Sequence, residues 1–141
     1  MDFNNALFRI QECLERMKIL YGEQMFDEWL IIDFREHQGK ALYYSGPRSG
    51  EFDSKFRSEL DGLKGLLAEH DYQPGNFEFA RLSVSTRYDA AITIAPRIYL
   101  VFNHTTKGMF QIRQNQGWIN ALVPFLELAD KFQRDPLTVR N

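Results

Sequence analysis

The stretch that decides the fold is residues 90–102, which read AAITIAPRIYLVF. It holds two apolar runs, 90–95 and 98–102, separated by Pro96 and Arg97. Short runs rich in β-branched and aromatic residues favour strands, and proline cannot donate a hydrogen bond to a sheet ladder. We therefore expect two successive strands here, with the ladder bent or ended at Pro96.

A second pair of strands is predicted nearer the start of the chain. Residues 29–32 form an unbroken apolar run, and residues 41–44 form another. The charged stretch between them ends in Gly39, a residue that readily adopts a positive φ. These features predict a β-hairpin.

Three segments show the spacing of amphipathic helices. Apolar residues recur at steps of three and four in the approximate ranges 2–21, 51–70 and 119–133. Gly22 is placed to end the first helix. Pro124 is tolerated in the last one if an N-cap at Asn120 puts it near the first turn.

The remaining segments complete the predicted order. Residues 77–84 alternate imperfectly and predict a strand, while 103–117 fit either a short strand or extended connector, which we favour, or a helix capped by Thr106. The predicted fold class is α+β, with a mainly antiparallel five-stranded sheet covered by helices in the order α-β-β-α-β-β-β-α. Residues 1–134 are expected to form one domain, followed by a flexible tail at 135–141.

Composition excludes several classes of protein. The chain has 141 residues, 17 Lys and Arg against 19 Asp and Glu, and 44% hydrophobic residues. It is too hydrophobic for disorder and too interrupted by charge to span a bilayer. Its near-neutral balance argues against nucleic-acid binding, and a single cysteine with no signal-peptide pattern indicates a cytoplasmic protein.

Both faces of the predicted sheet need cover. The strands at 29–33, 90–95 and 98–102 are apolar on both alternating sets of residues, as strands buried on two sides are. The terminal helices can cover one face and the middle helix the other, or a second copy of the chain can complete the layer beside the middle helix. Either arrangement is compatible with the sequence.

The aromatic content and two glycines favour the second copy. Twelve Phe, six Tyr and two Trp exceed what one small core readily hides, and aromatic residues are typical of interfaces. Gly62 and Gly65 inside the middle helix each cost about 1 kcal/mol relative to alanine, which suggests a close approach to the sheet or to another subunit. The candidate partner or dimer contacts are Phe52, Phe56, Gly62, Gly65, Phe77 and Phe79.

The order of elements resembles the roadblock/LC7 family, small regulatory proteins with a profilin-like or longin-like layout. The matching features are the helix that ends at Gly22, the apolar strand 29–33, Gly39 before 41–45, and the adjacent strands in 90–102. The resemblance implies a homodimer formed through the middle helix and a neighbouring strand. It also implies regulatory binding, often to a small Ras-like GTPase, and no catalytic residues.

Candidate catalytic and ligand-binding residues are few. His37, His70 and His104 lack the spacing of metal ligands, Cys13 falls on the apolar face of the first helix, and Arg81, Arg87 and Arg97 lie near acidic residues. We expect no cofactor and no metal. The leading interpretation is a non-enzymatic, homodimeric protein-interaction or scaffold domain.

Three alternatives remain open. The first is a small, acidic, dimeric chaperone similar to those of type III secretion, although that group usually has three strands before its middle helix. The second is a small-molecule-binding or hydrolytic domain with a pocket between the sheet and the last helix, with His104 and Arg97 at its mouth. The third is a binder of single-stranded nucleic acid.

Overall fold

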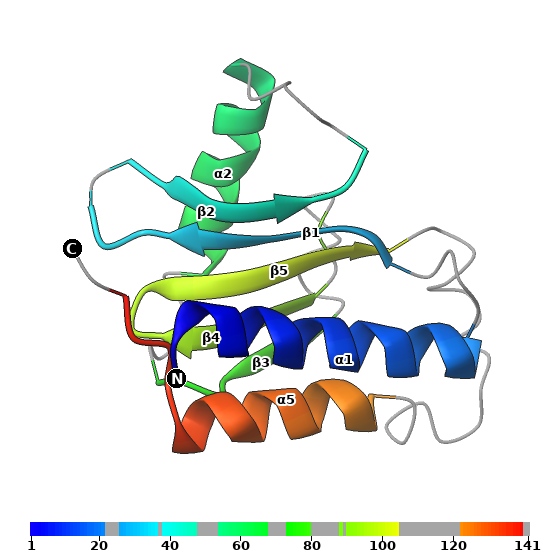
Figure 1. The fold of residues 1–141 in the computed structure, drawn as a ribbon. Coiled ribbons are helices and arrows are strands. Elements are labelled where there is room, and N and C mark those ends of the chain that lie inside the picture. The colour runs from blue at the N-terminus through cyan, green and yellow to red at the C-terminus, as the bar shows by residue number, and fades with distance from the viewer. Residues whose placement is uncertain are drawn as a thin grey trace.

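The protein is described by a computed structural model that covers residues 1–21, 26–36, 38–47, 54–67, 73–79, 88, 90–104 and 122–139. The order of elements is the predicted one (Figure 1), with bounds as follows: α1 Phe3–Tyr21, β1 Phe26–Asp33, β2 Lys40–Ser45, α2 Ser54–Leu67, β3 Phe77–Phe79, β4 Ala90–Ala95, β5 Ile98–His104 and α5 Val123–Arg134. The predicted α+β class is therefore confirmed. None of the helices in the described ranges is long and apolar enough to cross a membrane.

The five strands form one antiparallel sheet. Their order across the sheet is β2-β1-β5-β4-β3, so the two most apolar strands, β5 and β4, lie at or next to its centre. All six residues of β4 are buried. Strand pairing thus places the two apolar runs, 90–95 and 98–102, inside the molecule, as their lack of polar alternation requires, while Pro96 and Arg97 between them are exposed.

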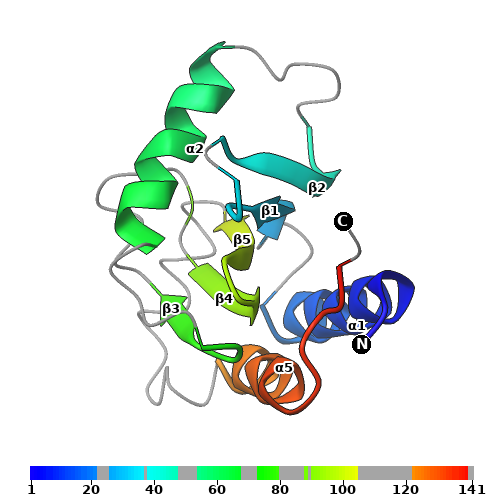
Figure 2. The same cartoon turned by 90° about the vertical axis from the view of Figure 1, so that its left-hand side faces the viewer.

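The helices cover the two faces unequally. Figures 1 and 2 show α1 and α5 side by side along the strands on one face, while α2 crosses the strands on the other face. Two separate apolar clusters result, one under α1 and α5 and one under α2. The terminal helices therefore share one face and the middle helix covers the other, which is one of the two arrangements that the sequence allows.

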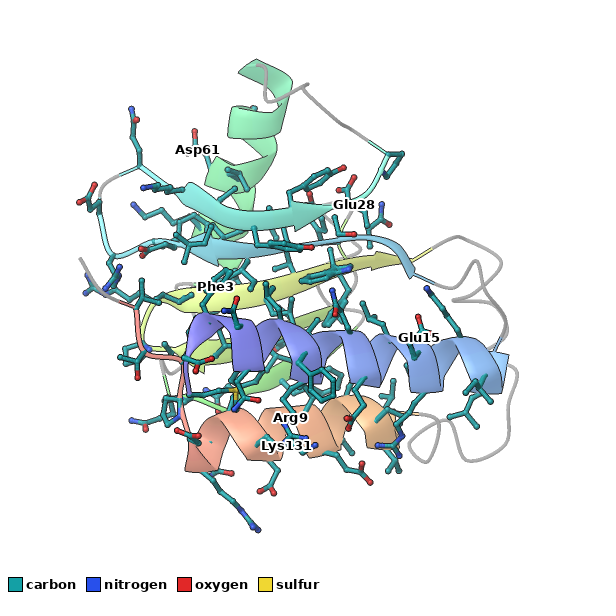
Figure 3. All side chains as sticks on the ribbon, viewed as in Figure 1. Phe3, Arg9, Glu15, Glu28, Asp61 and Lys131 are labelled. Carbon is teal, nitrogen blue, oxygen red and sulfur yellow. The ribbon has the colours of Figure 1, made fainter. Side chains whose placement is uncertain are left out.

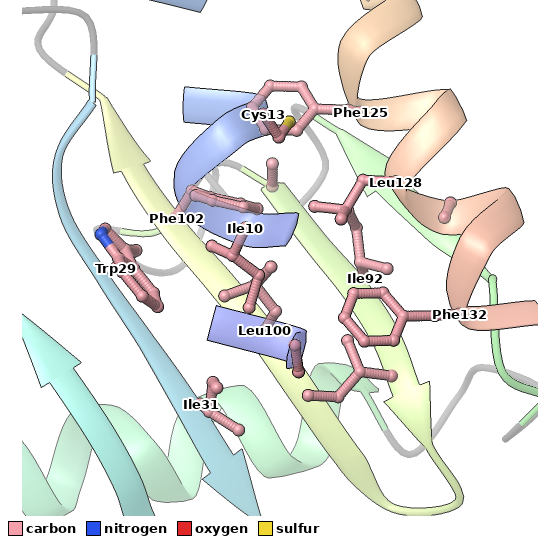
Figure 4. Packing of buried hydrophobic residues seen from close by; sticks show 14 of the residues in the cluster. Ile10, Cys13, Trp29, Ile31, Ile92, Leu100, Phe102, Phe125, Leu128 and Phe132 are labelled. Atoms are coloured by element: carbon pink, nitrogen blue, oxygen red, sulfur yellow. The ribbon is translucent and has the colours of Figure 1, made fainter. Parts of the chain in front are cut away.

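The larger cluster is densely aromatic. Ile10 from α1 and Phe132 from α5 point into it, and the ring of Phe102 on β5 lies 4.9 Å from that of Phe125 in a tilted arrangement (Figure 4). Tilted rings at this distance gain energy beyond the burial of their area. On the outer surface, Arg16 of α1 pairs with Glu127 of α5, but this exposed pair contributes little to stability.

The backbone conformations of two turn residues, Gly39 and Arg97, differ from the prediction. Gly39 does not adopt a positive φ; it is needed for space, because a Cβ there would lie 2.5 Å from the ring of Phe34. Arg97 does adopt a positive φ of 63°, in the tight turn after Pro96. Its backbone oxygen accepts a hydrogen bond of 2.9 Å from the amide of Phe34, which ties the two turns together.

The C-terminal segment differs from the predicted flexible tail over residues 135–139. Leu137 is buried, and its amide donates a hydrogen bond of 2.9 Å to the oxygen of Ile94. The amide of Thr138 donates another of 2.9 Å to the oxygen of Met1. The segment is held because one apolar side chain completes the larger cluster, a contact that a short stretch after Pro136 does not reveal in sequence.

The remaining differences concern boundaries. The last helix starts at Val123 rather than near 119, so Pro124 sits in its first turn without the predicted Asn120 cap. Strand β1 starts three residues before the predicted run, and β5 extends to His104. Gly22 and the segments 80–87 and 105–117 lie outside the described residues.

Candidate functional site

The outward side of α2 is the first candidate surface. Its buried residues, Leu60, Leu63 and Leu67, face the sheet. We call the opposite side, made by Ser58, Asp61, Gly62 and Gly65, the α2 outer face; all four are exposed. Apart from the chain neighbours and the backbone of α2 itself, no atom of the described residues lies within 4 Å of a Cβ built on Gly62 or Gly65. The predicted close approach of these glycines to their own sheet is therefore wrong.

The other predicted contact residues do not join this face in the described structure. The ring of Phe77 is half-buried and stacks on Phe125 at 5.8 Å, inside the larger cluster. Phe79 pairs with Ala90 through its backbone. The side chains of Phe79 and Phe56, and the whole of Phe52, lie outside the described residues.

The described aromatic residues are mostly buried. Among the large hydrophobic side chains that are exposed in the described ranges, Phe8 is the one aromatic, and the others are Ile19, Leu20, Val123 and Leu126. The described part of the chain therefore shows little surplus aromatic surface. Among the described surfaces, the α2 outer face is the candidate for contact with a partner.

A buried polar cluster is the feature that the sequence did not reveal. Glu28 of β1 is 0% exposed, close to the start of its strand (Figure 3). Its Oε1 accepts a hydrogen bond of 2.8 Å from the hydroxyl of Tyr88, and its Oε2 accepts one of 2.9 Å from the hydroxyl of Tyr44. A carboxylate buried in this way is tolerated because both oxygens are hydrogen-bonded.

The Glu28 cluster joins three segments that are distant in sequence. Tyr44 belongs to β2, and Tyr88 lies two residues before β4. A Cβ on Gly46 would stand 2.7 Å from the hydroxyl oxygen of Tyr44 and 3.0 Å from Cγ of Glu28, so this glycine leaves the cluster room. With both oxygens bonded and no exposed surface, the side chain of Glu28 holds these three segments together.

Part of this cluster had a signal in the sequence. Side chains alternate along a strand, so extending β1 backward from Ile32 and Leu30 places Glu28 on the same buried face. The sequence does not indicate that Tyr44 and Tyr88 are its partners, because their hydroxyls lie 16 and 60 residues away along the chain.

A second charged group lies at the opposite end of β1. Asp33 accepts hydrogen bonds from Nε of Arg35 at 3.0 Å and from its Nη2 at 2.8 Å. Burial alone would favour the neutral acid, but the hydrogen bonds and charge of Arg35 outweigh it and hold the pKa of Asp33 below its ordinary value. This ion pair joins the end of β1 to the turn that follows it.

Arg97 and His104, which were predicted to lie at the mouth of a pocket between the sheet and the last helix, are not close together along the backbone. Arg97 precedes β5 and His104 ends it, so the backbone separates them by roughly 23 Å, at about 3.3 Å per residue of strand. His37, His70, Arg81 and Arg87 lie outside the described residues. Within the described ranges, no group of three His, Cys, Asp or Glu side chains could hold a metal ion.

Cys13 lies in α1 and is buried in the larger cluster. Burial raises the pKa of its thiol from 9.0 to about 12, against a smaller opposing effect of Arg16. The reactive thiolate is therefore scarce at neutral pH, which agrees with the predicted inert thiol.

This pKa predicts a pH dependence of stability. The raised pKa in the folded state favours folding below pH 9.0, the ordinary thiol value, and that contribution disappears as pH rises toward about 12. Between these limits, Cys13 should add up to about 1.4 kcal/mol per pH unit to the fall in unfolding free energy. Urea titrations of wild type and Cys13→Ala should differ by this slope. Parallel curves would contradict the prediction.

The structure is an α+β domain whose antiparallel sheet carries an apolar cluster on each face. No cluster of catalytic side chains was found among the described residues. Comparison of the chain with protein-family models, with curated proteins and with solved structures gave no match.

Proposed function

We propose that this chain is a non-enzymatic protein-interaction domain that forms a homodimer through the α2 outer face. The observation that carries the proposal is the exposure of Gly62 and Gly65, with no described residue outside their own stretch of α2 within 4 Å of either Cβ position. Each interior glycine costs a helix about 1 kcal/mol relative to alanine. A helix surface without side chains lets another backbone approach closely. Contacts made in this way would offset the loss of helix stability caused by the two glycines.

The surroundings of the two glycines suit a symmetric contact. In a two-fold dimer the same patch meets itself, so every residue of the α2 outer face lies opposite a residue of the same set. Ser58 and the glycines are small, and Asp61 is exposed beside them. Two α2 helices could therefore cross at short distance without displacing bulky side chains.

The resemblance to roadblock/LC7 proteins adds a partner class. It supports a regulatory role, with a small Ras-like GTPase as the partner to test first and the cytoplasm as the location. The chaperone alternative has less support, because two strands rather than three precede α2. The hydrolytic alternative has less as well, because Arg97 and His104 lie at opposite ends of β5.

Alanine at the two glycines tests the proposal by the sign of its effect. In an isolated exposed helix, Gly62→Ala and Gly65→Ala should each raise the unfolding free energy by about 1 kcal/mol at every protein concentration. In a dimer packed on these positions, each added methyl group pushes the helices apart. We therefore expect both variants to lose the extra stability that wild type gains at high concentration.

Gln11→Ala is the control, because that position is exposed on α1, away from the α2 outer face, and already carries a Cβ. It should keep the dependence of stability on concentration. Urea unfolding at low and high protein concentration measures all four proteins. Stabilisation by both glycine variants at every concentration, with no concentration dependence in wild type, would contradict the proposal.

A further inference from the structure

We draw no further inference here: the strongest candidate, the exposed apolar surface patch on the outer side of α1 and α5, made among the described residues by Phe8, Ile19, Leu20, Val123 and Leu126, carries none because nothing in the structure shows what covers it.

Discussion

Replacing Glu28 by alanine is expected to lower the unfolding free energy by about 3–5 kcal/mol, because two effects add. The hydroxyls of Tyr44 and Tyr88 lose the acceptor that they share, and a buried donor without its acceptor costs about 1–3 kcal/mol. The missing carboxyethyl group also leaves a void in a fully buried position. Urea unfolding of wild type and Glu28→Ala measures the loss.

Two companion variants show whether the hydrogen bonds or the void dominate. Glu28→Gln keeps the volume and an acceptor, so it should recover part of the lost stability. Tyr88→Phe removes the hydroxyl that donates to Oε1 and should cost about 1–3 kcal/mol. If the unfolding free energy of Glu28→Ala lies within about 1 kcal/mol of that of wild type, the conclusion that Glu28 holds three segments together is contradicted.

Replacing Phe125 by alanine is expected to cost a similar amount, about 3–5 kcal/mol, through loss of packing alone. This fully buried ring of α5 contacts Phe102 on the central strand β5 and Phe77 on β3. Its removal leaves a cavity between the helix and the sheet that two neighbouring rings cannot fill without moving.

Leu126→Ala is the matched control, because the next residue along the same helix is 43% exposed. Its cost should stay below about 1 kcal/mol. Thermal or urea unfolding compares the two variants at one protein concentration, so that self-association does not enter the difference. Equal losses at the two positions would contradict the orientation of α5 on the sheet.

The fold could be predicted because its determinants are local and periodic. The apolar runs at 90–95 and 98–102 have no polar alternation, so they could only be strands buried on both sides. The three-and-four spacing of α1 likewise specified which residues, such as Ile10 and Met17, would be buried. These patterns do not depend on distant residues.

The candidate site was harder to predict because its geometry depends on distant contacts. The sequence indicated that Gly62 and Gly65 were unusual, but only the packing of α2 showed that they face away from the sheet. Phe77 has an aromatic side chain of the kind found at interfaces, but its half-buried ring stacks on Phe125, 48 positions later, against the larger cluster. Leu137 was predicted to lie in a flexible tail, because the sequence does not show that its amide donates a hydrogen bond to the oxygen of Ile94 in β4.

Sedimentation equilibrium of the wild-type chain is the most direct test of self-association through α2. At tens of micromolar we expect a mass of twice 16.6 kDa, and Gly65→Arg, which places a long charged side chain on the α2 outer face, should sediment at 16.6 kDa with an unchanged circular dichroism spectrum. A wild-type mass of 16.6 kDa throughout that concentration range would contradict the account, as would a dimer that Gly65→Arg leaves intact.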